Sequence, residues 1–307
     1  MEKQNIFDLS FCTLCPHECG VNRHTHTGYC NVGANPMVSS IFPHRGEEPV
    51  ISGEKGICNV FFAHCNLQCV FCQNHQISRN SSMSNKWLTN TSIIVDEIKR
   101  ILETGISMLG FVSPSHQVAQ MVEIINALNK SGYKPIIVYN SNGYDKVETL
   151  KKLEGIVDVY LPDLKYYNSN LAFRYSGVSD YFQVASNAIK EMYRQKGSSL
   201  ILNNEGLVEF GLIIRHLVLP GYADDSINLL NFLADEVSPK LHVSLMSQYY
   251  PPAELSLPAE LNQHVGINEY KKVVDVLENH GFRGWVQDIE SNQYYRPDFE
   301  SSNPFTD

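Results

Sequence analysis

Short apolar runs alternate with longer amphipathic segments from residue 57 to the end of the chain. Each run is a few residues long, is rich in β-branched or aromatic side chains and is bounded by turn-forming residues, which is typical of buried strands. The predicted strands cover residues 57–63, 107–112, 135–139, 157–161, 212–219, 242–246 and 284–286.

The segments between these runs have the periodicity of helices. Ile94, Ile98, Ile101 and Leu102 fall on one helical face, and Gly105 follows as a residue that ends helices. A second apolar face, also ended by a glycine, consists of Val118, Met121, Val122, Ile125 and Leu128. Further helices are predicted over residues 180–195, 225–235 and 268–279.

Strands and helices that alternate at these lengths predict βαβ units and therefore a parallel sheet. Six or seven such units can close into a full or partial barrel. We therefore expect an α/β protein in which residues 56–307 form one barrel domain and residues 1–55 form an N-terminal extension. A chain of 307 residues is long enough to build one core of this size.

The extension is predicted to consist mainly of loops, because glycine and proline recur throughout it. It holds four cysteines with the spacing C-x2-C-x3-C-x10-C, namely Cys12, Cys15, Cys19 and Cys30. This spacing is close to that of a metal knuckle, and the extension has too few apolar residues to fold alone. Two interpretations stay open here: a metal site, holding zinc or a second iron–sulfur cluster, and free thiols packed on the barrel.

The composition argues against a membrane protein and against an exported one. The chain has no run of about 18 apolar residues, so we expect no transmembrane helix. Residues 1–5 are polar and lack the apolar stretch of a signal peptide. We therefore expect a cytoplasmic protein, in which the eight cysteines are metal ligands or free thiols rather than disulfides.

The charge of the chain bears on its partners. The formal net charge is −9, and lysine and arginine do not cluster anywhere along the sequence. A protein that binds nucleic acid usually presents a basic patch. We therefore do not expect nucleic acid as a partner.

The first predicted strand is followed by three closely spaced cysteines, Cys65, Cys69 and Cys72, in the octapeptide CNLQCVFC. Thiolates are soft ligands that suit zinc or iron–sulfur clusters, and both usually take four protein ligands. Three thiolates leave one coordination position of a cluster open, which is where a substrate or cosubstrate normally binds. The alternatives are three packed cysteines, or a closed zinc site completed by His64 or His75.

The octapeptide resembles the cluster motif of the radical S-adenosylmethionine superfamily, C-x-x-x-C-x-aromatic-C, with Phe71 at the aromatic position. The resemblance implies a [4Fe–4S] cluster on the three cysteines, with S-adenosylmethionine on the fourth iron. It also favours the open, partial (β/α)6 form of the TIM-like barrel. The leader CTLCPHECGVNR, with Gly28 and Cys30 after it, resembles a branch of this superfamily related to pyruvate formate-lyase activating enzyme.

The predicted strands end in polar residues, at the edge where parallel α/β barrels build their sites. Asp163 and Lys165 follow the fourth strand and share one face, because residues i and i+2 do so in a strand. They form a surface ion pair or a functional one. They resemble the D-x-K motif of glycyl-radical activating enzymes, which implies contact with the cosubstrate.

Other strand ends extend the same resemblance. Ser113 occupies the place of a Gly-Gly-Glu-type turn, so its hydroxyl or nearby carbonyls would accept from the amino group of S-adenosylmethionine. Asn140 and Asn142 end the third strand, in a segment that lies near the ribose in this branch. We expect Gln248, after the sixth strand, to face the substrate.

Arg215 lies inside an apolar strand, where a charge must be paired. The segment 215–221 resembles the R-x-V-V-x-P-G segment of activating enzymes. We expect Arg215 to pair with the carboxylate of the cosubstrate or of Asp163, because a guanidinium matches a carboxylate in fork geometry. His216 points to the opposite face and is a packing residue or a functional one.

The sequence therefore predicts a radical S-adenosylmethionine oxidoreductase that forms a 5′-deoxyadenosyl radical and abstracts hydrogen from its substrate. A flavodoxin or ferredoxin would supply the electron, and the substrate would be a glycyl radical enzyme. One alternative is an epimerase or dehydrogenase that acts on a small molecule such as a sugar. A hypothesis of a different class is a non-catalytic protein that binds zinc or has a redox role.

Overall fold

The computed structural model describes residues 6–293, 296–301, 304 and 305. The sheet of these described residues has nine strands, of which seven run parallel, and each predicted apolar run is confirmed as one of these seven. In sheet order they are β2 (Ile57–Phe62), β3 (Met108–Val112), β4 (Ile136–Ser141), β5 (Val159–Pro162), β7 (Val208–Leu217), β8 (His242–Met246) and β9 (Arg283–Val286).

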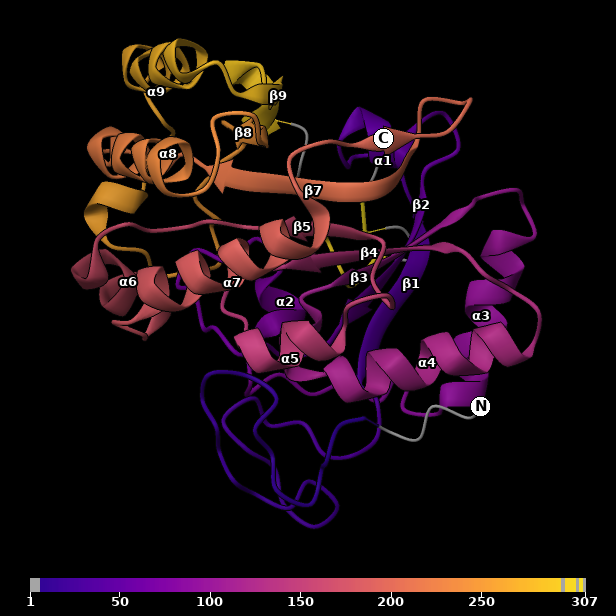
Figure 1. The fold of residues 1–307 in the computed structure, drawn as a ribbon. Coiled ribbons are helices and arrows are strands. Elements are labelled where there is room, and N and C mark those ends of the chain that lie inside the picture. The colour runs from indigo at the N-terminus through magenta and orange to yellow at the C-terminus, as the bar shows by residue number, and fades with distance from the viewer. Residues whose placement is uncertain (1–5, 294–295, 302–303, 306–307) are drawn as a thin grey trace.

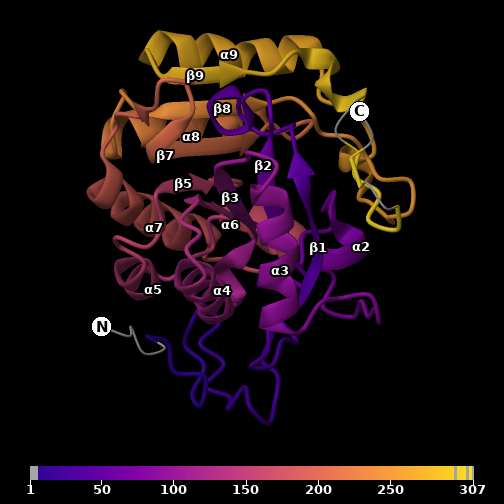
Figure 2. The same cartoon turned by 90° about the vertical axis from the view of Figure 1, so that its right-hand side faces the viewer.

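Two strands were not predicted. β1 (Val38–His44) runs antiparallel to β2 at one edge of the sheet, and the short β6 (Ile201–Leu202) pairs with the beginning of β7. The predicted boundary at residue 55 therefore falls between two paired strands. Figure 2 shows β1 and β9 at opposite ends of the curved sheet, which is an open, partial TIM-like barrel.

Helices cover the outer side of this sheet (Figure 1). The five predicted helices are confirmed with small shifts of their ends, whereas α5 and α6 were not predicted. The longer helices are α3 (Thr91–Leu102), α4 (Val118–Lys130), α5 (Val147–Lys152), α6 (Ser169–Ser176), α7 (Tyr181–Lys196), α8 (Ala223–Glu236) and α9 (Ile267–His280). No helix in the described part of the chain is both long and apolar enough to cross a membrane.

Side chains alternate between the outward and inward faces of each strand, and the two faces lie in different environments. The outward side chains of β2, such as Cys58 and Val60, are buried in the main core beneath the helices. The inward side chains at the beginnings of the strands form a second apolar cluster, against which the short α1 (Pro49–Ser52) packs Ile51. Toward the ends of the same strands, the inward positions become polar or line a cavity.

Gly143 brings the ends of β4 and β5 close together. Its φ is +78°, and an added Cβ would lie 2.1 Å from the carbonyl oxygen of Asp163. We expect Gly143→Ala to lower the free energy of unfolding by about 2–5 kcal/mol, from left-handed strain and overpacking together. Gly132→Ala is the matched control, because Gly132 also has a positive φ but nothing lies within 4 Å of its added Cβ.

Gly132→Ala should lower the free energy of unfolding by about 1–2 kcal/mol, because only the backbone is strained. Urea unfolding of the two variants and the parent protein measures the difference. Equal losses in the two variants would show that the close approach of β4 and β5 is not a constraint.

Candidate functional site

Cys65, Cys69 and Cys72 lie on the loop between β2 and the short helix α2 (His75–Ser78), which we call the cluster loop, residues 63–74. Cys65 and Cys69 are buried and Cys72 is half-buried. All three line one cavity of about 200 Å³, at the edge where the parallel strands end. The structure therefore brings the three thiols to one cavity.

Each of the three sulfur atoms accepts a hydrogen bond from a different side chain. Asn142 Nδ2 donates to Cys65 Sγ at 3.2 Å, Ser176 Oγ donates to Cys69 Sγ at 3.0 Å, and Ser78 Oγ donates to Cys72 Sγ at 3.2 Å. Hydrogen bonds to ligand sulfurs orient them and tune the potential of a bound cluster. Ser78 and Ser176 were not predicted, because nothing in the sequence near them resembles a motif.

Burial governs the protonation of these thiols. Desolvation raises the pKa of Cys65 to about 12, and it also raises the pKa of Cys69, although the nearby Lys165 ammonium opposes that rise. A bound metal centre would supply the positive charge that such buried thiolates need. Among the described residues, no three His, Cys, Asp or Glu side chains are grouped closely enough to hold one metal ion.

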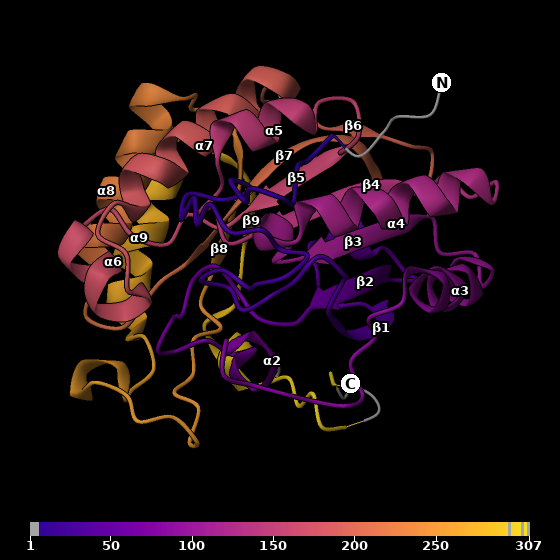
Figure 3. The same ribbon diagram turned by 90° about the horizontal axis from the view of Figure 1, so that it is seen from below.

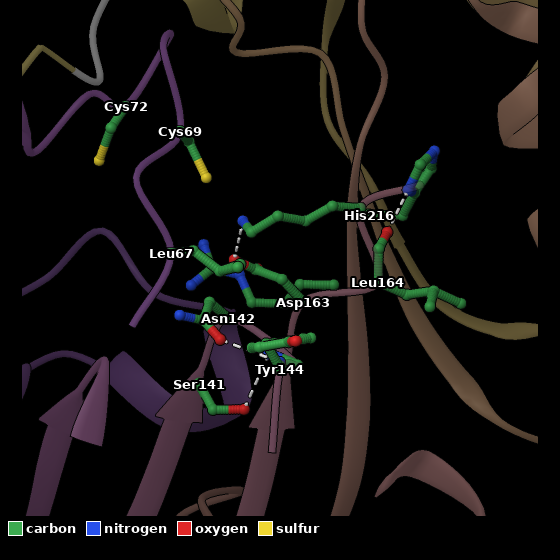
Figure 4. A network of polar contacts seen from close by, with 12 residues as sticks. Leu67, Cys69, Cys72, Ser141, Asn142, Tyr144, Asp163, Leu164 and His216 are labelled. Atoms are coloured by element: carbon green, nitrogen blue, oxygen red, sulfur yellow. Dashed lines mark hydrogen bonds and ion pairs between the residues drawn. The ribbon is translucent and has the colours of Figure 1, made fainter. Parts of the chain in front are cut away.

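Asp163 and Lys165 face each other beside the cluster loop. Asp163 Oδ2 and Lys165 Nζ are 2.6 Å apart, and both side chains are about three-quarters buried. Burial alone would lower the pKa of Lys165, but the carboxylate of Asp163 raises it above its ordinary value. Lys165 is therefore charged at neutral pH. Figure 4 shows Asp163, Asn142, Cys69 and Cys72 around one space.

The other residues predicted to bind the cosubstrate or substrate also line this cavity, whereas Cys12, Cys15, Cys19 and Cys30 do not. Ser113 has a positive φ of 54°, an unusual conformation for a residue with a Cβ, and its N–H donates to the carbonyl of Asn140. Phe71 packs its ring edge-on against three tyrosines. Gln248 is joined to the cluster loop, because Gln73 Nε2 donates to its carbonyl at 3.1 Å.

The predicted ion pair between Arg215 and Asp163 is wrong. The Arg215 side chain does not pair with Asp163 but lies 3.1 Å from Glu47 Oε2 and 3.3 Å from Glu48 Oε1. Asn59 Nδ2 also donates to Glu47, at 2.9 Å. Burial raises the pKa of Glu48, although Arg215 opposes this effect. The two glutamates come from the loop after β1 and form, with Arg215, part of the inner wall beneath the cavity.

The sequence missed Glu47 and Glu48, although it showed that Arg215 needed a partner. An adjacent pair of acidic residues before Pro49 was the available signal, but Glu47 lies 168 positions from Arg215 along the chain. No local pattern connects segments that far apart. Tertiary packing alone determines this pairing.

The histidines behave as packing residues. His216 is buried on the opposite face from Arg215, and its Nδ1 donates to the carbonyl of Leu164 at 2.6 Å. Burial lowers the pKa of His216 to about 4, so it is neutral at pH 7. Both ring nitrogens of His64 contact carbonyl oxygens, those of Cys30 and Ser82, so His64 is not a fourth ligand on the cluster loop.

The described residues near the C-terminus, 296–301, 304 and 305, which we call the C-terminal segment, form one wall of the cavity. This wall was not predicted from the sequence. Pro297 and Phe305 line the cavity, and Phe305 packs against Phe42 and Phe61 of β1 and β2. Gln76 of α2 accepts from the backbone N–H of Phe299 at 2.7 Å. Figure 3 shows this segment beside α2.

Comparison with known proteins agrees with this site. Residues 51–178 match the family model described as a 4Fe-4S single cluster domain. The uncharacterized protein MJ0674 of Methanocaldococcus jannaschii is 29% identical over 294 residues, which cover 91% of this chain and 80% of that protein.

Two solved structures share the fold. A radical SAM methyltransferase from Sphaerobacter thermophilus superposes with a TM-score of 0.52 at 14% identity, covering 75% of this chain and 66% of that chain. SuiB of Streptococcus suis, bound to the precursor peptide SuiA, gives a TM-score of 0.50 at 12% identity, covering 74% and 47%. This chain therefore spans less than two thirds of either solved chain.

The chain therefore has the fold of these two solved structures, and its residues 51–178 match a 4Fe-4S single cluster domain that contains the motif CNLQCVFC. The domain match indicates a [4Fe–4S] cluster, and the resemblance of the cysteine motif implies S-adenosylmethionine as its partner. The residues present fit the cluster, because three thiols face one cavity and each has its own hydrogen-bond donor.

We expect Arg215→Met to lower the free energy of unfolding by about 3–5 kcal/mol at pH 7.5, because it leaves buried carboxylates without their cation. Burial raises the pKa of Glu48 and the Arg215 charge opposes that rise, so without Arg215 the folded variant binds a proton at Glu48 more readily than the folded parent does. The deficit should therefore shrink as the pH falls toward 5.5. Arg100→Met, which removes an exposed pair with Glu97, is the control and should change stability by less than about 0.5 kcal/mol.

Ser176→Ala should make the midpoint potential of the bound cluster more negative while the iron content is unchanged. One hydrogen bond contributes about 1 kcal/mol, which corresponds to about 40 mV for one electron. A redox titration followed by electron paramagnetic resonance measures the shift. Ser186→Ala, on α7 and bonded only to the carbonyl of Gln183 among the described residues, is the control. An unchanged potential in Ser176→Ala would refute the assigned role.

Proposed function

We propose that this chain is an enzyme that binds S-adenosylmethionine at a cluster held by Cys65, Cys69 and Cys72. The bound, reduced cluster would supply the chemistry, namely reductive cleavage of S-adenosylmethionine to a 5′-deoxyadenosyl radical that abstracts hydrogen from the substrate. The observation that supports this proposal is the set of three cavity-lining thiols, each with its own hydrogen-bond donor.

The strand ends would bind the cosubstrate. Lys165 is charged and lies beside the cysteines, so its ammonium would attract a carboxylate while Asp163 fixes its position. Ser113 and Asn142 offer hydrogen-bonding groups on the neighbouring strand ends. Asn140 and Gln248 would contact the parts of the cosubstrate or substrate that lie further from the cluster.

The apolar residues of the cavity would keep water away from a reactive radical. Leu67 and Phe71 do this on the cluster loop, and Phe305 does it on the C-terminal segment. Arg215 lines the same cavity and would hold its inner wall in place through Glu47 and Glu48.

We further propose that a flavodoxin or ferredoxin supplies the electron and that the hydrogen is taken from a glycyl radical enzyme. This version rests on the resemblance of the segments around Asp163 and Arg215 to activating enzymes. A small-molecule substrate is the second candidate, and the C-terminal segment favours it. Pro297 and Phe305 limit the cavity on the side of α2, which suits a compact substrate.

The test is anaerobic reconstitution with iron and sulfide, followed by addition of dithionite and S-adenosylmethionine and measurement of 5′-deoxyadenosine. We expect product from the parent protein and none above background from a variant with Cys65, Cys69 and Cys72 all changed to alanine. Cys58→Ala is the matched control, because Cys58 is a buried thiol on the outward face of β2 and should leave the activity unchanged.

A parent protein with a full cluster and no 5′-deoxyadenosine would contradict the enzyme assignment and favour a non-catalytic metal-binding protein. The two substrate versions give different signals. A glycyl radical detected by electron paramagnetic resonance after mixing with a candidate partner supports activation. A yield of 5′-deoxyadenosine that rises with one sugar, in the absence of any partner, supports the small-molecule version.

A further inference from the structure

The N-terminal extension contains a second group of cysteines that the proposed reaction does not use. Residues 6–37 form no helix or strand, and Figure 1 shows them as loops at the bottom of the view. Hydrogen bonds attach these loops to the barrel, for example from Thr149 Oγ1 to the carbonyl of Leu14 at 2.7 Å. Inside the extension, the buried residues include three of its four cysteines, Cys12, Cys15 and Cys30.

The four cysteines lie close together. The N–H of Gly20, next to Cys19, donates to the carbonyl of Cys12 at 2.9 Å, which holds the backbone at these two cysteines together. The charges of Cys30, Cys12 and Cys19 each act on the Cys15 thiol, so all three lie near it. A tight turn follows Cys15, in which the N–H of Glu18 donates to the carbonyl of Cys15 at 3.0 Å.

The backbone around Cys19 is shaped to fit its sulfur. The N–H of Tyr29 donates to Cys19 Sγ at 3.3 Å. An added Cβ at Gly28 would lie 2.8 Å from the same sulfur, so only glycine leaves room for it. Backbone N–H groups that donate to a sulfur stabilise a thiolate and are typical of the surroundings of metal-bound cysteines.

Arg23 gives an independent indication of negative charge in this region. The side chain is 2% exposed, and its Nε and Nη1 donate to the carbonyls of Val32 and His116. Its Nη2 is buried with no hydrogen-bond partner, and no carboxylate of the described residues forms an ion pair with it. A buried charge requires a counter-charge, and Arg23 lies close enough to Cys30 to oppose the burial effect on that thiol.

We propose that Cys12, Cys15, Cys19 and Cys30 hold a second metal centre through four thiolates, with the buried guanidinium of Arg23 as its counter-cation. Zinc and an iron–sulfur cluster share this ligand chemistry, and with four thiolates each gives a negatively charged centre. The sulfur atoms are not grouped around one point in the structure. The same holds for Cys65, Cys69 and Cys72, so metal binding would draw each set together.

The proposed metal centre would also stabilise the neighbouring cluster loop. His17 lies between Cys15 and Cys19, stacks on Tyr29 at 3.8 Å and contacts the carbonyl of Asn66 in the cluster loop at 2.7 Å. A centre that fixes Cys15 and Cys19 would therefore fix His17 and brace the cluster loop from outside. This holds whether or not the chain cleaves S-adenosylmethionine.

Elemental analysis of the cluster-reconstituted full chain tests the proposal. We expect the iron of one 4Fe-4S cluster together with either one zinc ion or the iron of a second cluster. Which of these two is found identifies the second metal. Cys15→Ala with Cys30→Ala should remove the second metal and keep the first, whereas Cys69→Ala should do the reverse. Cys58→Ala should keep both. A parent protein that holds no metal beyond one cluster would overturn the proposal.

A second measurement starts from the parent protein and adds one milder variant. A mercurial reagent added to the parent protein should release the second metal along with the first, and a colorimetric chelator counts each. Cys19→Ala, at the half-buried position of the four, should weaken retention of the second metal alone. Full retention of both metals in the Cys19 variant and in the double variant would also overturn the proposal.

Discussion

The site depends on the parallel alignment of the strands. Because side chains alternate across each strand and all the parallel strands end at one edge, their inward positions converge there from segments far apart in the sequence. Asn142, Asp163 and Arg215 meet in this way, and the cluster loop follows β2 at the same edge. The apolar inward residues below them exclude water, which leaves one cavity in which charged groups act strongly on one another.

Two hydrogen-bonded systems hold this edge in shape. At the cluster loop, Asn142, Ser176 and Ser78 each donate to one cysteine sulfur, so three separate elements position three thiols. At the inner wall, Arg215 joins β7 to the loop after β1 through two glutamates. Breaking either system leaves a buried polar group without its partner, which costs more than an exposed contact would.

The sequence predicted the parallel core well, because apolar periodicity determines which segments are strands and helices. It missed β1, because the Val38–His44 segment does not alternate between apolar and polar residues and lies in a stretch punctuated by glycine and proline. At the site, local motifs identified the cysteines, Asp163 and Lys165. The partners of Arg215, the serines that bind the sulfurs and the C-terminal Phe305 could not be found, because each acts through contacts between distant segments.

We propose that the three cysteines leave one iron of the cluster open for S-adenosylmethionine. The most direct test is the electron paramagnetic resonance spectrum of the reduced, reconstituted protein before and after S-adenosylmethionine is added. We predict that the cofactor changes the g-values of the cluster, because its amino and carboxylate groups would bind the iron that no cysteine holds. A spectrum that is unchanged at saturating S-adenosylmethionine would contradict the account.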